Sequence, residues 1–107
     1  MVDRTLKSQS GRNFVIKYVP VSNGSFVLIS EDSDQIGAIS VSISSSNKSN
    51  TAKVIPSKYD SVFLNTISEM VSRMRNGICI ASLYSTKQLT LEDMKIIMDH
   101  IRDLIGN

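Results

Sequence analysis

The second half of the chain alternates between two hydrophobic periodicities, and this alternation restricts the fold more than any other feature. Residues 62–74 and 91–105 carry apolar side chains at intervals of three and four, which predicts two amphipathic helices. Residues 51–55 form a short extended run that Pro56 ends, and residues 77–84 form an almost unbroken apolar strand. The order strand, helix, strand, helix predicts helices that pack on a sheet.

The first half of the chain has the pattern of an antiparallel meander. Its strands are predicted at residues 4–9, 14–19, 26–29 and 36–43, and turn sequences such as Asn23-Gly24 separate them. We therefore expect an α+β fold in which this meander is followed by strand, helix, strand and helix. One sheet would carry two packed helices, within a single domain that spans residues 1–107.

Composition and charge exclude several classes of protein. The net charge of +2 arises from basic residues scattered among acidic ones, so nucleic acid is not an expected partner. No apolar segment approaches the length that crosses a bilayer, so no membrane association is expected. The single cysteine excludes an internal disulfide, and the N-terminus lacks the apolar stretch of a secretory signal. The expected location is the cytoplasm, with access to the nucleus by diffusion.

The sequence offers little reactive chemistry. His100 is the single histidine and lies near the end of a predicted helix, while Cys79 lies within the most apolar strand. No histidine and cysteine spacing suits a metal, and the acidic turn at residues 31–34 lacks calcium-loop spacing. We therefore expect no catalytic residues, no cofactor and no metal, and we interpret the chain as a binding protein rather than an enzyme.

One face of the predicted sheet has no obvious cover. Two helices account for one face, yet residues 26–29 and 78–83 are apolar on both faces. In the strand at residues 36–43, isoleucine and valine point one way and small side chains point the other. We expect a second chain to bury the small-residue face, although one helix on each face is an open alternative. The residues expected at this dimer interface are Val27, Ile29, Ala38, Ser40, Ser42, Ile78 and Ile80.

From Gly24 onward the chain resembles a proteasome assembly chaperone of the chaperone 3 type. The residues that carry the resemblance are the strand at 25–29, the segment 35–42, the run 51–54, both helices and the strand at 78–84. Residues 56–61 are more similar to the sister chaperone 4. The resemblance implies a small α+β protein without catalytic residues that dimerises through sheet faces.

The resemblance also implies partners. Chaperones 3 and 4 form a heterodimer that binds an α-ring subunit, typically subunit 5, and helps to order the α ring of the 20S proteasome; a homodimer is the other option for this chain. The polar segment at residues 44–50 is too polar to pack and is expected to be a mobile loop that contacts the partner. Its residues are Ser44, Ser45, Ser46, Asn47, Lys48, Ser49 and Asn50.

Two other functions stay open at the level of sequence. One is a roadblock- or longin-like scaffold subunit of a membrane-traffic or signalling complex, although such folds usually place a helix between early strands. The other is a small enzyme or ligand-binding domain, for which the sequence offers only His100, Cys79 and Tyr84 as polar groups near the core.

Overall fold

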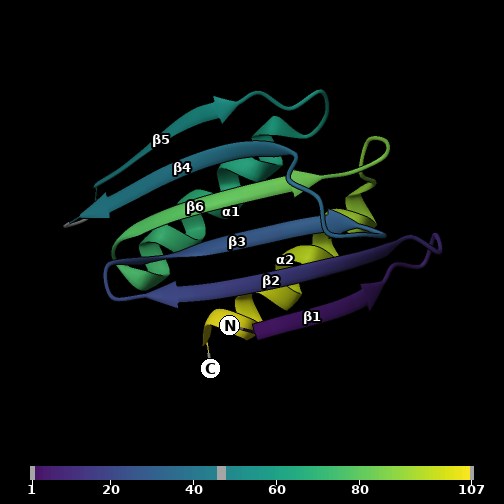
Figure 1. Cartoon of the computed structure of the whole chain (residues 1–107), viewed down its shortest axis with the longest axis horizontal. Coiled ribbons are helices and arrows are strands. Elements are labelled where there is room, and N and C mark those ends of the chain that lie inside the picture. Colours follow the sequence, from purple (N-terminus) through teal and green to yellow (C-terminus); the bar gives the residue numbers. More distant parts are fainter. Residues whose placement is uncertain (1, 46–47, 107) are drawn as a thin grey trace.

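The computed structural model describes residues 2–45 and 48–106 and has both helices on one face of a sheet (Figure 1). The helices are α1 (Ser61–Arg75) and α2 (Leu91–Gly106). The strands are β1 (Val2–Lys7), β2 (Asn13–Val21), β3 (Gly24–Glu31), β4 (Ala38–Ser45), β5 (Lys48–Ile55) and β6 (Ile78–Tyr84). The α+β fold expected from the sequence is confirmed.

The six strands form one mixed sheet in the order β1-β2-β3-β6-β4-β5. Strands β1, β2 and β3 are antiparallel neighbours, as the meander predicts. Strand β6 lies between β3 and β4, parallel to the first and antiparallel to the second. The two strands that are apolar on both faces, β3 and β6, are therefore the two central strands, where each is flanked by a neighbour on both sides.

The core lies between the sheet and the two helices. Phe63, Ile67 and Val71 lie on the buried face of α1, and Ile97 and Ile101 lie on that of α2. Each fully buried side chain of this size contributes about 1.5–3 kcal/mol before conformational entropy is counted. The strands supply the opposite side of the core with Leu6, Phe14, Ile16, Tyr18, Val27, Ile29, Cys79, Ala81 and Leu83.

Side-chain hydrogen bonds fix the starts of both helices. Thr90 and Asp93 form a capping box at the start of α2, because each side chain accepts a hydrogen bond from the other residue's backbone N–H at 3.0 Å. Helix α1 begins after Asp60, but the Asp60 carboxylate accepts the Leu89 N–H at 2.9 Å instead of capping its own helix. This contact joins the starts of the two helices.

The left-handed residue at the end of α1 is Asn76, at φ 51°, and not the glycine that follows it. Gly77 is required for a different reason. A Cβ atom on Gly77 would lie 2.4 Å from the Asn23 carbonyl oxygen, so a side chain would force β6 away from the turn before β3.

Candidate interaction surface

The sheet face opposite the helices is uncovered and apolar. In β3 and β4, Phe26, Leu28, Ile39, Val41 and Ile43 alternate with the buried residues and point away from the helices. Phe26 is 47% exposed and Ile43 is 50% exposed, although neither β3 nor β4 is an edge strand. Contiguous exposed apolar side chains of this kind usually mark an interaction site.

The apolar face is hollowed over its centre. A groove of about 360 Å³ lies over β2, β3, β6 and β4, and its lining is almost entirely apolar. Ile36, which is 72% exposed, rises at one side of the groove from the segment between β3 and β4. The main lining side chains are Val19, Phe26, Leu28, Ile36, Ile39 and Ile80. A groove beside projecting aromatic and aliphatic side chains suits another protein surface better than a small polar ligand.

One charged pair lies at the side of this groove. The Lys17 ammonium lies 2.5 Å from an Asp34 carboxylate oxygen, and this hydrogen bond raises the pKa of Lys17. Lys17 lines the groove on its β2 side, so the pair lies at the margin of the apolar area over β3, β6 and β4. An apolar centre with a polar rim is the usual anatomy of a protein–protein interface.

The dimer-interface residues expected from the sequence are divided between the two faces. Ile78 and Ile80 lie on the uncovered face and are partly buried there. The expected orientation of the others was wrong, since they point toward the helices and are buried within the monomer. These residues are Val27, Ile29, Ala38, Ser40 and Ser42. Alternation predicts that a strand has two different faces, but it does not say which face the helices cover.

Helix α1 covers the small-residue face of β4 through a row of hydroxyl groups. The Ser68 Oγ lies 2.8 Å from the Ser42 Oγ and 3.0 Å from the Ser40 Oγ, and the Ser44 Oγ lies 2.7 Å from the Ser72 Oγ. All five serines are buried. Small side chains let the helix approach the sheet closely, so their size reflects packing by α1 rather than by a second sheet.

The polar segment expected to be a mobile loop is largely part of a β-hairpin. Ser44 and Ser45 end β4, and Lys48, Ser49 and Asn50 begin β5, so the loop prediction was wrong for these residues. The Ser49 Oγ donates to Glu69 at 3.0 Å and accepts from Arg73 at 3.1 Å, which ties the hairpin to α1. Backbone pairing and these contacts supply hydrogen-bond partners to a segment that is too polar for the core. Ser46 and Asn47 lie outside the described residues.

A buried ionic cluster joins β2, β3 and α2. Arg12 donates to Glu31 at 2.7 Å, to Asp93 at 3.0 Å and to the Lys87 and Gln88 carbonyl oxygens at 3.0 and 2.9 Å. The Arg12 hydrogen bond lowers the pKa of Glu31 to about 2, against the opposing effect of burial. Burial would raise the pKa of Asp93, but hydrogen bonds led by that of Thr90 hold it below its ordinary value. Glu31 is therefore a structural group and not part of a solvated turn.

The remaining candidates for chemistry are not arranged as a catalytic site. Cys79 is fully buried, and burial raises the pKa of its thiol to about 12, so it remains protonated at neutral pH. The Nδ1 of His100 is buried and has no hydrogen-bond partner in the described part of the chain. Within residues 2–45 and 48–106 no three histidine, cysteine or acidic side chains lie close enough to hold a metal ion. No described helix is long and apolar enough to cross a membrane.

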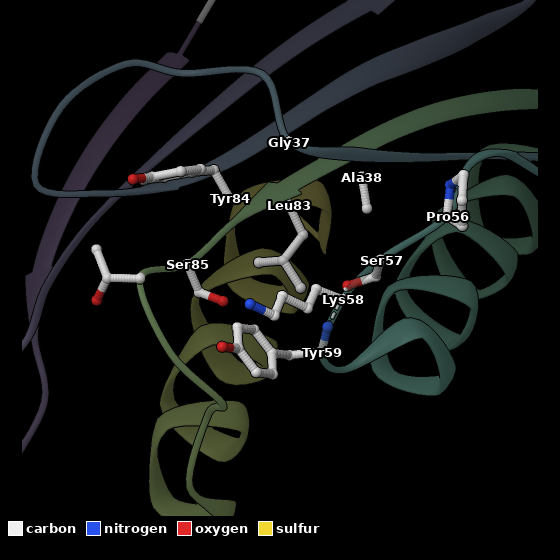
Figure 2. A pocket seen from close by; sticks show the side chains of 10 residues that line it. Gly37, Ala38, Pro56, Ser57, Lys58, Tyr59, Leu83, Tyr84 and Ser85 are labelled. Atoms are coloured by element: carbon white, nitrogen blue, oxygen red, sulfur yellow. Dashed lines mark hydrogen bonds between the residues drawn. The ribbon is translucent and has the colours of Figure 1, made fainter.

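A second, more polar cavity lies where β5 ends (Figure 2). Its volume is about 360 Å³, and Lys58 is the single charged residue among the described residues that line it. The Lys58 ammonium lies 5.6 Å from the centre of the Tyr59 ring. In Figure 2 the Lys58 side chain extends across the cavity toward Ser85, above the ring of Tyr59. This arrangement favours an anionic group over a cationic one.

Comparison with known proteins gives one informative result. No protein-family model matches the sequence, and no curated protein matches it. The chain is similar in structure to a chain from the crystal structure of a novel chaperone complex for yeast 20S proteasome assembly, with a TM-score of 0.57 and 13% sequence identity. The match covers 98% of this chain and 87% of that one. At this identity the likeness concerns the fold.

Proposed function

We propose that this chain is a non-catalytic assembly chaperone of the 20S proteasome. It pairs through its uncovered sheet face with a second small chaperone, or with a second copy of itself, and the pair binds an α-type subunit during formation of the α ring. The resemblance in sequence makes subunit 5 the expected α subunit. The expected location is the cytoplasm, with access to the nucleus by diffusion.

The uncovered apolar face carries this proposal. Phe26, Ile36 and Ile43 remain about half or more exposed on one side of a sheet whose other side has a complete core. Burying a side chain of this size contributes about 1.5–3 kcal/mol, so a partner sheet that covers the groove would gain substantially from contact with a few such residues. The interface we propose keeps Ile78 and Ile80 and replaces the helix-covered residues with Phe26, Leu28, Ile39, Val41 and Ile43.

The fold supports the same proposal independently of the face. The chain resembles a component of a proteasome-assembly chaperone complex over nearly its whole length. An assembly chaperone would be expected to show such a likeness. Among the described residues, the titratable side chains are buried in structural contacts or lie scattered on the surface, so a binding role fits better than catalysis. Residues 44–50 are a proposed contact with the α subunit.

The experiment pairs two substitutions that place a glutamate at an exposed apolar position. Phe26→Glu alters the uncovered sheet face, while Leu91→Glu alters an 84% exposed position at the start of α2. Tagged versions of both variants and of the unchanged chain are used for capture from native lysate and for sedimentation. We expect Phe26→Glu to weaken pairing about a hundredfold or more, because it places an unpaired charge in an apolar interface. Leu91→Glu should pair as the unchanged chain does.

Mass spectrometry of the captured proteins tests the assembly role. Recovery of α-type proteasome subunits together with a second small chaperone, and few β subunits, supports the proposal. Recovery of GTPases or tethering factors without proteasome subunits contradicts it and indicates a trafficking scaffold. Equal capture of the second small chaperone by Phe26→Glu and by the unchanged chain, together with equal sedimentation of the two, contradicts the interface.

A further inference from the structure

The charged side chains are divided unevenly along the chain. Residues 44–76 carry five basic side chains and two acidic ones, while the rest of the chain has seven basic and eight acidic ones. This basic segment includes β5, which is an outermost strand, and α1, which packs mainly on β4 and β6 and also contacts β5. The basic residues are Lys48, Lys53, Lys58, Arg73 and Arg75. One edge of the sheet is therefore positively charged.

The two acidic side chains of this segment do not neutralise its lysines. Glu69 accepts from Arg73 at 2.7 Å, and the Asp60 carboxylate is occupied by the Leu89 N–H. Within the described residues no carboxylate lies within ion-pair distance of Lys48, Lys53 or Lys58. These lysines can therefore attract an external anionic group.

Strand β5 also offers a free edge. It pairs only with β4, so the described part of the sheet has no strand along its outer side. Nearly all of its residues are exposed, including Val54 at 59% and Ile55 at 45%. An open edge supplies backbone donors and acceptors to an added strand, while its lysines repel a second copy of the same edge.

The polar cavity lies just beyond the C-terminal end of β5, next to the start of β4 and the end of β6. Pro56 to Tyr59, which directly follow β5, form one wall of the cavity, and residues 83–86 form another (Figure 2). The only charged group in its described lining is Lys58, accompanied by hydroxyl groups such as those of Ser57 and Ser85. A carboxylate at the end of an added strand would find an ammonium group and hydroxyl donors there.

We propose that the outer edge of β5 binds an extended acidic segment of a protein partner, which adds to the sheet as a strand and places a carboxylate in the cavity beside Lys58. Exposed Val54 and Ile55 between the lysines favour a peptide over a nucleic acid, because a nucleic acid would gain little from apolar side chains on a strand. This edge is separate from the uncovered sheet face, so the inference does not depend on the proposed pairing through that face.

The probe is a peptide in which glutamate and valine alternate, and its control has glutamine in place of glutamate. Each is titrated into the ¹⁵N-labelled chain while amide shifts and amide hydrogen exchange are followed by NMR. We expect the acidic peptide to shift and protect amides of β5 and residues 56–59, with an affinity that falls as salt rises. Lys53→Glu and Lys58→Glu should each weaken binding about tenfold.

The matched control is Lys7→Glu, since Lys7 ends β1, the strand at the opposite edge of the sheet. This variant should bind the acidic peptide as the unchanged chain does. Equal binding of the two peptides, or shifts that lie away from β5, would overturn the proposal. Tighter binding of a single-stranded oligonucleotide at the same salt would also overturn it and would identify the edge as a nucleic-acid site.

Discussion

Arg12 and Glu31 form a two-point ion pair that is closed to solvent. The Arg12 Nη2 lies 2.7 Å from Glu31 Oε1, and its Nε lies 3.0 Å from Oε2. Both side chains are less than a tenth exposed. Because Arg12 precedes β2 and Glu31 ends β3, the pair fixes the register of these strands where α2 begins.

The Glu31 carboxylate predicts a loss of stability in acid. The pKa of Glu31 falls from its ordinary value of 4.5 to about 2 in the folded chain. Its ionised form is therefore favoured by folding, so the contribution is complete above pH 4.5 and is lost as the pH falls toward 2. The free energy of unfolding, measured with urea at a series of pH values, should fall by about 3 kcal/mol across this range from Glu31 alone.

The Glu31→Gln variant isolates this contribution. It lacks the titrating carboxyl, so its free energy of unfolding should depend less steeply on pH in the same range, although it is lower throughout. The lowered pKa of Asp93 acts in the same direction and leaves a residual slope in the variant. Parallel pH profiles for the two proteins would contradict the assignment.

Replacing Arg12 should be among the most destabilising single changes. Arg12→Met leaves Glu31 and Asp93 buried without their cation, and two carbonyl oxygens lose their donor. We expect a loss of about 3–5 kcal/mol in urea unfolding. The control is Arg4→Met, since Arg4 pairs with Asp103 near the surface at 2.5 Å, and this change should cost about 1 kcal/mol or less. Similar losses for the two variants would contradict the buried cluster.

Cys79 should report global unfolding. Its side chain is fully buried in β6 and its pKa is raised to about 12, so the thiolate is scarce at pH 8 in the native chain. A thiol reagent should therefore react at the rate at which the sheet opens, and the rate should rise with urea in parallel with unfolding. Rapid alkylation of the native chain without urea would show that β6 opens locally.

Sequence patterns predicted the elements well because the core is built from regular periodicities. The apolar spacing of α1 and α2, the capping box at Thr90 and the double-sided strand β6 are local signals that the structure retains. The insertion of β6 between β3 and β4 is a long-range pairing, and no local pattern encodes it. No local pattern predicts that Arg12 is buried, because its partners Glu31 and Asp93 lie far away in sequence.

The candidate interface was harder to predict than the fold. An uncovered apolar face could be inferred because β3 and β6 are apolar on both sides, and the structure has such a face. Which side of β4 belongs to it depends on where α1 packs, and alternating serines and aliphatic residues are compatible with either choice. The hydroxyl row on α1 would have been the signal, since Ser68 and Ser72 interrupt its apolar stripe at the positions that face β4.

Adjacent residues of β4 provide a direct test of which face is covered. Ser42 is fully buried beneath α1, whereas Ile43 is 50% exposed on the opposite face. Ser42→Glu places a charge among the serine hydroxyls and should lower the free energy of unfolding by about 3–5 kcal/mol. Ile43→Glu should leave that free energy nearly unchanged in the monomer and should weaken self-association or pairing instead. Urea unfolding and sedimentation of the two variants separate these effects, and a stable, monomeric Ser42→Glu chain would show that α1 does not cover this face.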